Sequence, residues 1–158
     1  MEKDIKIVEY TPEYQEAFKT INVEWLTDMF EVEEYDNKVL SDPKKYILNR
    51  KGNIWIALLD DAPVGTIALM ELEDRKFELT KMGVTKTARG YGVGRKLLRF
   101  LIDKIFNTQE NTYFLLTNSN CKAAIHLYEE FGFKHNEEIR TKYGIYYKRC
   151  DVGMLYTP

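Results

Sequence analysis

Three glycines at alternate positions, Gly90, Gly92 and Gly94, lie between Arg89 and Arg95 and just before a segment that favours a helix. The first backbone N–H groups of a helix have no partner within the helix, and the helix dipole adds about half a positive charge there. Glycine removes the Cβ that would keep phosphate oxygens away from the backbone, and it permits positive φ angles. Because the arginines add positive charge at both ends, this turn is typical of a pyrophosphate-binding site.

Two well-known phosphate-binding motifs do not fit the turn. The dinucleotide motif GxGxxG would need its third glycine one position after Gly94, and the nucleotide P-loop would need a Gly-Lys-Ser or Gly-Lys-Thr sequence that does not follow here. A turn of this composition that binds nothing also fits the glycine spacing alone. The ligand therefore has to be inferred from the elements on either side.

The turn is expected to connect a strand to a helix. Residues 76–84 follow two β-rich segments and predict a third strand, and residues 93–106 place apolar side chains three and four positions apart on one helical face. Further along the chain, residues 112–118 indicate a buried strand. Residues 121–131 indicate a helix that ends at Gly132, where a left-handed cap is favourable.

The N-terminal half supplies further strands and helices. Residues 4–10 alternate as a short strand, and Pro12 is expected at the first position of a helix. A second helical stretch covers roughly residues 33–51, with a restart expected at Ser41-Asp42-Pro43. Residues 53–60 and 62–72 predict a β-hairpin joined by two aspartates.

The last third of the chain alternates, is rich in tyrosine and predicts a hairpin that ends in residues 147–156. Together the elements predict an α+β fold of the three-layer α/β kind, with a mixed, mostly antiparallel central sheet flanked by about four helices. Because the chain has 158 residues and no linker, we expect residues 1–158 to form a single domain. The tyrosines could form a homodimer surface, although a folded-back hairpin explains them equally well.

Composition limits the classes of function. A net charge of −2 disfavours a nucleic-acid partner, and without a run of 18 apolar residues no membrane span is expected. The N-terminus lacks the apolar core of a signal peptide, and Cys121 and Cys150 fit free thiols, so a cytoplasmic protein is expected. His126 and His135 do not pair with a cysteine at metal-ligand spacing, so no metal site is expected.

Two motifs together resemble the GNAT superfamily of N-acyltransferases. The sequence Arg-x-x-Gly-x-Gly at residues 89–94, with the strand before it, resembles the acyl-CoA motif of that family. Residues 121–133, CKAAIHLYEEFGF, resemble its Asn-x-x-Ala-x-x-Leu-Tyr-x-x-x-Gly-Phe helix, although Cys121 takes the place of the usual asparagine. The resemblance covers nearly the whole chain. It leaves open whether Asn118, Asn120 or Cys121 contacts the cofactor.

The resemblance implies that acetyl-CoA is the co-substrate and that its acetyl group passes directly to an amine in a ternary complex. In the family, the strand before the turn carries a bulge and separates from its neighbour, which frees backbone groups for the pantetheine arm. Met82 and Val84 would supply these contacts here, with the Met82 N–H donating to the reacting carbonyl oxygen. Gly83 fits a bulge or a close ligand, or else it lets another side chain pack. The expected cofactor-binding residues are Met82, Val84, Arg89, Gly90, Tyr91, Gly92, Val93, Gly94, Arg95 and Asn118.

Glu78 and Tyr128 are the candidate catalytic residues. Because alternate residues of a strand share a face, Glu78 is expected on the same side as Met82, where it would take the amine proton directly or through a water. A solvated edge charge is the alternative for Glu78. Tyr128 matches the Leu-Tyr position of the family helix and would protonate the leaving thiolate, whereas the alternative is a core tyrosine.

The acceptor is less well defined. Residues 28–36 contain five acids and no base, and in the family the N-terminal helices help to wall the acceptor pocket. These acids could attract a cationic amine, although a solvated loop face also explains them. We expect the acceptor to be a small-molecule primary amine or an amino acid. The alternatives are a non-catalytic acyl-CoA-binding module and a protein N-acetyltransferase.

Overall fold

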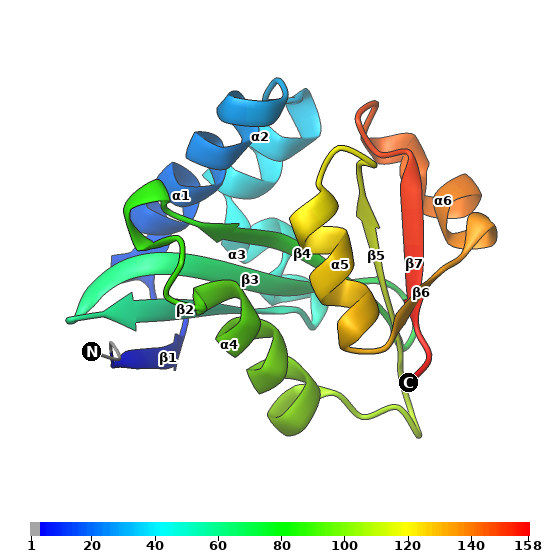
Figure 1. Cartoon of the computed structure of the whole chain (residues 1–158). Helices are drawn as coiled ribbons and strands as arrows, with labels where there is room; N and C mark the ends of the chain where they lie inside the picture. Colours follow the sequence, from blue (N-terminus) through cyan, green and yellow to red (C-terminus); the bar gives the residue numbers. More distant parts are fainter. Residues whose placement is uncertain (1–3) are drawn as a thin grey trace.

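A seven-stranded sheet in the order β1-β2-β3-β4-β5-β7-β6 forms the centre of the protein (Figure 1). The structure is a computed structural model and describes residues 4–158. Within that range, β4 and β5 form the one parallel pair, so the sheet is mixed and mostly antiparallel, as expected. The strands are β1 (Ile5–Glu9), β2 (Asn53–Leu59), β3 (Ala62–Glu73), β4 (Lys76–Val84), β5 (Thr112–Thr117), β6 (Phe133–His135) and β7 (Val152–Tyr156).

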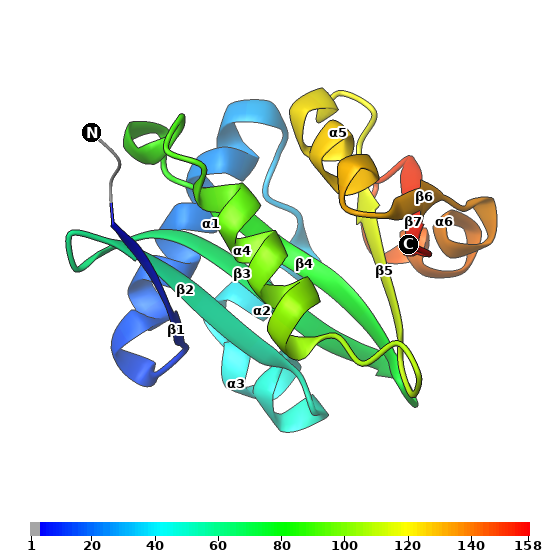
Figure 2. The same ribbon diagram turned by 60° about the horizontal axis from the view of Figure 1, so that its bottom comes forward.

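Helices cover both faces of the sheet and make three layers (Figure 2). Between residues 4 and 158 there are six α-helices, where about four were expected, and the additional ones are short. None of the helices in this range is both long and apolar enough to cross a membrane. The helices are α1 (Gln15–Met29), α2 (Glu34–Ser41), α3 (Pro43–Tyr46), α4 (Val93–Phe100), α5 (Lys122–Glu130) and α6 (Glu137–Tyr143).

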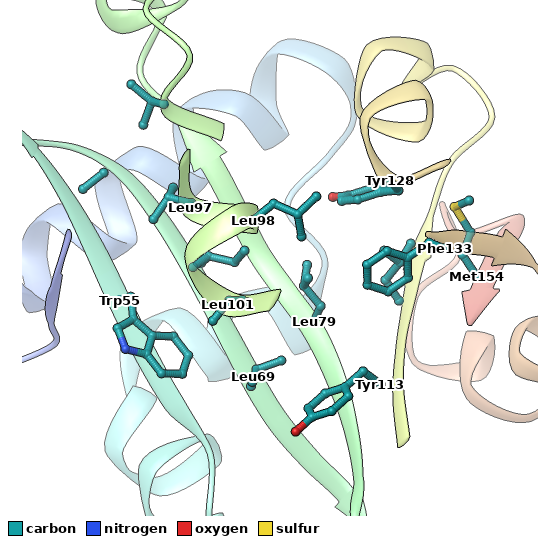
Figure 3. Packing of buried hydrophobic residues seen from close by; sticks show 14 of the residues in the cluster. Trp55, Leu69, Leu79, Leu97, Leu98, Leu101, Tyr113, Tyr128, Phe133 and Met154 are labelled. Carbon is teal, nitrogen blue, oxygen red and sulfur yellow. The ribbon is translucent and has the colours of Figure 1, made fainter. Parts of the chain in front are cut away.

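Two apolar cores hold the layers together. On one face, Leu97 and Leu101 of α4 pack on Leu69 and Leu79 of the sheet (Figure 3). On the other face, α1, α2 and the segment after them pack on side chains such as Met70 of β3. Each fully buried side chain of this size stabilises the fold by about 1.5–3 kcal/mol.

Most of the predicted elements are confirmed. The β2–β3 hairpin turns at Asp60 and Asp61, whose φ angles of 50° and 66° suit a tight two-residue turn. The predicted helix from residue 93 is formed by α4 and a π-helical turn at Leu101–Ile105. The left-handed cap is also present, because Gly132 has a φ of 107°.

The C-terminal prediction was wrong in one respect. β6 and β7 do pair in antiparallel fashion, but α6 connects them in place of a tight hairpin, and β7 lies between β5 and β6. The Asn136 side chain caps α6 by accepting from the Ile139 N–H, and two glutamates follow in its first turn. Tyr143 at the end of α6 and Tyr147 in the segment after it are buried, so these tyrosines pack into the protein without being part of a strand.

Two irregularities in the middle of the sheet create an opening. β4 and β5 pair only from Lys76 opposite Thr112 to Leu79 opposite Leu115, and beyond that point the strands separate (Figure 2). β4 also carries a bulge, because three steps along β4 match two steps along β3. Lys81 lies in this bulge with a φ of 52°.

Candidate active site

A pocket of about 320 Å³ lies in the opening between β4 and β5. The second half of β4, from Glu78 to Val84, forms one wall, and the end of β5 and the start of α5 form another. Trp25, Met29 and Phe30 at the end of α1 close the pocket on a third side, together with the segment 147–150. The separation of the two strands therefore supplies both the space and the residues that line it.

The glycine turn has the geometry of an anion-binding loop. Gly90 and Gly92 have φ angles of 91° and 77°, and a Cβ at either residue would meet no protein atom within 4 Å. These glycines are therefore required by the backbone conformation, and the space above them is open to a ligand. Gly92 is the N-cap of α4, so the free N–H groups of that helix lie at the same place.

A second hollow of about 370 Å³ lies above this turn. It is lined by Gly90, Gly92, Val93, Gly94 and Arg95, among others. Val84, Arg89 and Ala123 line both this hollow and the first pocket, so the two spaces adjoin. A continuous path therefore leads from the helix N-terminus to the opening beside β4.

The expected cofactor residues differ in how accessible they are. Arg89 is exposed, and none of the described residues pairs with its side chain. Arg95 forms an ion pair with Glu130 of α5 and lies over the Phe131 ring, so a bound phosphate would have to share it. Tyr91 is partly exposed at the tip of the turn. Val93 is buried, so that only its backbone can face the hollow.

Gly83 has a packing role. A Cβ at this position would lie 2.5 Å from Cδ1 of Trp25, which is too close for any real side chain. The bulge residue is Lys81 and not Gly83, so the structure supports the alternative in which Gly83 makes room for another side chain. The bulge and the strand separation implied by the resemblance are nevertheless both present.

Glu78 is buried at the base of the pocket, with only 4% of its surface exposed. It is the single acidic residue among the described residues that line this pocket. Burial raises the pKa of the Glu78 carboxyl to about 7, although the positive charges of Lys81 and Arg149 act to lower it. A carboxyl with this pKa can accept a proton near neutral pH, and it is not the solvated edge charge of the alternative.

The expectation that Glu78 and Met82 share a face of β4 was wrong. Glu78 lies opposite Met70, whose side chain belongs to the core beneath α1 and α2. Met82 packs on the other face, close to Tyr128. The extra residue in the bulge reverses the alternation between the two positions, and both still reach the pocket because β4 is open on its β5 side.

Tyr128 reaches the pocket from α5. Its hydroxyl lies 3.9 Å from the Met82 Sδ and points away from the helix toward the side of Leu98 (Figure 3). Burial, reinforced by the neighbouring Cys121, raises the pKa of Tyr128 well above its ordinary value. The hydroxyl therefore stays protonated and can donate a proton or hydrogen bond to an anion in the pocket.

Asn118 is engaged within the chain. Its amide donates to the Arg149 carbonyl at 2.6 Å, and its side-chain oxygen accepts from the Asn120 N–H at 2.8 Å. These contacts hold the end of β5 against the segment before β7. Asn118, Asn120 and Cys121 all line the pocket, so which of them contacts a cofactor stays a prediction.

The acids of residues 28–36 do not form the entrance that the sequence suggested, since none of them lines the pocket. Asp28 pairs with Lys86 at 2.9 Å, and Glu33 pairs with Arg149 at 3.2 Å. Asp36 is fully buried. These carboxylates therefore serve mainly to join the end of α1 and the start of α2 to the rest of the protein.

A buried charged cluster beneath the pocket was missed by the sequence reasoning. The Lys81 Nζ lies 3.0 Å from the Asp36 Oδ1 and 3.1 Å from the Tyr147 hydroxyl. The Arg149 guanidinium donates two hydrogen bonds to the Asp36 carboxylate, of 2.6 and 2.9 Å. The pKa of Asp36 is lowered: burial opposes ionisation, but Arg149 and Lys81 outweigh it. The available signal was a lysine inside a strand, at a position where lysine is unusual.

A chain of hydrogen bonds also anchors the bulge to α1. The Trp25 Nε1–H donates to the Asn22 Oδ1 at 2.9 Å, and the Asn22 Nδ2–H donates to the Thr66 hydroxyl at 3.0 Å. The Thr66 hydroxyl in turn donates to the Lys81 carbonyl at 2.7 Å. The carbonyl that the bulge removes from the regular ladder is thereby satisfied.

Comparison with known proteins gives the family. The model of the "Acetyltransferase (GNAT) family" matches residues 11–133, which is most of the chain. The chain belongs to the GNAT family. This result confirms the family that the two motifs of the sequence resembled.

Solved structures of GNAT proteins have the same fold. A GNAT-family acetyltransferase from Staphylococcus aureus Mu50 matches with a TM-score of 0.83 and 23% identity, over 96% of this chain and 98% of that one. An acetyltransferase from Streptococcus agalactiae matches with a TM-score of 0.80 and 25% identity, over 98% of both chains. The PaiA N-acetyltransferase of Thermoplasma acidophilum, in complex with coenzyme A, matches with a TM-score of 0.71 and 16% identity, over 98% of this chain and 99% of that one.

The relatives found by sequence have longer chains. The N-acetylaspartate synthetase of Xenopus tropicalis is 33% identical over 98 residues, which is 61% of this chain and 36% of the relative. The human N-acetylaspartate synthetase is 33% identical over 103 residues, which is 61% of this chain and 32% of the relative. This chain thus spans about a third of the length of these relatives.

Proposed function

We propose that this GNAT protein transfers the acetyl group of acetyl-CoA to a primary amine of a small molecule or an amino acid, directly and within a ternary complex. The observation that carries the proposal is the path from the glycine turn, along the open edge of β4, to the buried carboxyl of Glu78. Along this path the protein offers anion-binding groups, an apolar passage and a proton acceptor in that order.

The residues around the turn fit coenzyme A. The N–H groups at the start of α4 and the side chain of Arg89 would hold the diphosphate, because they are not used within the described chain. Met82 and Val84, on the edge of β4 that β5 leaves unpaired, would hold the pantetheine arm. When bound, acetyl-CoA supplies an acetyl group activated as a thioester.

Three groups of the protein assist the transfer of the acetyl group. Glu78, with a pKa of about 7, accepts the proton of the incoming ammonium group, directly or through a water. The Met82 N–H would donate a hydrogen bond to the carbonyl oxygen as negative charge develops on it. The Tyr128 hydroxyl, which stays protonated, donates to the departing sulfur.

The acceptor end of the pocket is mainly apolar. Trp25, Met29 and Phe30 line it, and Glu78 offers the one acidic contact among the described lining residues. The proposal is therefore an acceptor whose amine meets Glu78 while its body packs against α1. Aspartate should be among the amines tested as acceptors, because the relatives that are 33% identical to this chain in sequence are N-acetylaspartate synthetases.

The experiment is a thiol-release assay with acetyl-CoA and a panel of amines, run beside calorimetry with coenzyme A. Binding together with amine-dependent release of thiol, and a product heavier by one acetyl group, would support the proposal. Binding without transfer to any amine would favour a non-catalytic acyl-CoA-binding module. Transfer only to protein N-termini or peptides would favour a protein N-acetyltransferase.

A further inference from the structure

Lys81 is a lysine that the fold places inside the protein. Only 2% of its side-chain surface is exposed, although it belongs to a strand that borders a pocket. Burying an ammonium group costs several kcal/mol unless the charge is paired and hydrogen-bonded. Asp36 and Tyr147 satisfy it here, at 3.0 and 3.1 Å. A buried pair of this kind, next to the candidate base, requires an explanation beyond packing.

The bulge of β4 determines where the ammonium group lies. In a regular strand, the Lys81 side chain would lie on the same face as Leu79, beneath α4, because alternate residues share a face. With a φ of 52°, it turns toward α2 and lies on the same side as Glu78. Such a backbone conformation costs a residue with a side chain roughly 1–2 kcal/mol. The hydrogen bond from the Thr66 hydroxyl to the Lys81 carbonyl helps to hold it.

Several charged or titratable groups surround Glu78. Lys81 comes from β4 itself, and Tyr35 and Asp36 come from α2. The segment before β7 contributes Tyr147, Arg149 and Cys150. Among these groups only Lys81 and Arg149 carry a positive charge, and Arg149 forms ion pairs with Asp36 and Glu33. Lys81 has the larger effect of the two on Glu78.

We propose that Lys81 is a positioning residue that keeps the buried Glu78 carboxylate ionised and ready to accept a proton, and that Asp36 and Tyr147 exist to hold the Lys81 ammonium in place. The role assigned to Glu78 rests on the proposed function. The electrostatic effect of Lys81 on Glu78 does not, because it is a property of the protein without substrate. Burial lowers the pKa of Lys81, and the Asp36 carboxylate favours the ammonium form against it.

The test replaces Lys81 by methionine, which has a similar length and no charge. Asp36 keeps its two hydrogen bonds to Arg149, so the variant leaves no unpaired carboxylate. The Glu78 pKa is measured by carbon-13 NMR in protein labelled at glutamate carboxyls, without substrate, with Glu78→Gln identifying the signal. We expect Lys81→Met to raise the Glu78 pKa by about one unit.

Lys86→Met is the matched control. Lys86 lies beyond the end of β4 and its exposed ammonium group pairs with Asp28, so the change in net charge is the same. It should leave the Glu78 pKa unchanged, and Lys81→Arg should return that pKa toward the wild-type value. Lys81→Gln, whose amide can still donate to Asp36, is a second neutral variant with less disturbance of the fold.

An unchanged Glu78 pKa in the folded Lys81→Met or Lys81→Gln protein would overturn the inference. Loss of folding in both neutral variants, with Lys81→Arg folded, would likewise overturn it in favour of a structural role. The acid limb of the pH profile of kcat/KM should move to higher pH with the Glu78 pKa. If no amine is acetylated but the NMR shift is found, the proposed function fails while the link between Lys81 and Glu78 stands.

Discussion

Glu78 and Met82 lie four residues apart on β4 but face opposite sides of the sheet, because the bulge at Lys81 inserts one residue between them. The candidate base thus belongs to the face of α1 and α2, and the candidate oxyanion donor is next to Tyr128 on the face of α4 and α5. The two meet only because β5 separates from β4 after Leu79. The bulge in β4 and the separation of β4 from β5 together allow residues from both faces of the sheet to line one pocket.

Replacing Glu78 by glutamine should slow the chemical step. The amide has the same shape but cannot accept the ammonium proton, so we expect kcat to fall by roughly 10²- to 10⁴-fold. The affinity for coenzyme A, measured by calorimetry, should stay the same because Glu78 lies away from the glycine turn. Wild-type turnover in this variant would exclude Glu78 as the base.

The raised pKa of Glu78 also predicts how stability depends on pH. The folded protein binds this proton more tightly than the unfolded chain, so stability should fall as pH rises from about 4.5 to about 7. The pKa difference corresponds to about 3 kcal/mol. Glu78→Gln should therefore raise the melting temperature at pH 8 and change it little at pH 4. An equal shift at both pH values would contradict the assignment.

Replacing Tyr128 by phenylalanine should lower kcat by about tenfold or more, with a smaller change in the KM for acetyl-CoA. Tyr113→Phe is the control, since Tyr113 is equally buried but its hydroxyl accepts from the Asn107 N–H and does not line the pocket. That variant should lose stability but keep kcat. A Tyr128→Phe enzyme as fast as the wild type would mean that Tyr128 is simply a core residue.

Replacing Gly92 by alanine should weaken coenzyme A binding. The positive φ of 77° makes alanine unfavourable by roughly 1–2 kcal/mol, and the new Cβ would enter the space above the turn. Gly144→Ala is the control, because Gly144 has a φ of −68° and a Cβ there would make ordinary contacts at 3.8 Å. Equal affinities for coenzyme A in the two variants would count against the turn as the binding site.

Replacing Gly83 by alanine should destabilise the protein by about 1–3 kcal/mol, because the new Cβ would overlap Trp25. Thermal or urea unfolding would measure the effect, again with Gly144→Ala as the control. Little change would mean that Trp25 can move aside easily. In that case the hydrogen bonds from Trp25 through Asn22 would not hold the bulge in place.

Local signals in the sequence predicted much of the fold. The strand at residues 76–84 and the helix after the glycines were predicted correctly, because their patterns depend on neighbours in the chain. The glycine turn was predicted for the same reason, since Gly90 and Gly92 indicate positive φ angles directly. The family resemblance supplied the strand separation, which no local pattern encodes.

Features that depend on distant contacts were not predictable in this way. The short helix α6 was taken for part of a hairpin, although its cap at Asn136 was a usable signal. Asp36 was grouped with exposed acids, since nothing near it in the chain shows that Lys81 and Arg149 lie beside it in the fold. The bulge was associated with Gly83 because glycine is the usual sign of one, whereas here a lysine held by buried partners occupies it.

The most direct test of the account is a crystal structure of the protein with coenzyme A. We predict that the diphosphate contacts the N–H groups of residues 90–95, that the pantetheine arm lies along Met82 and Val84, and that the sulfur lies near the Tyr128 hydroxyl with Glu78 beyond it. Coenzyme A bound elsewhere, or bound at the turn with its sulfur directed away from Glu78, would contradict the account.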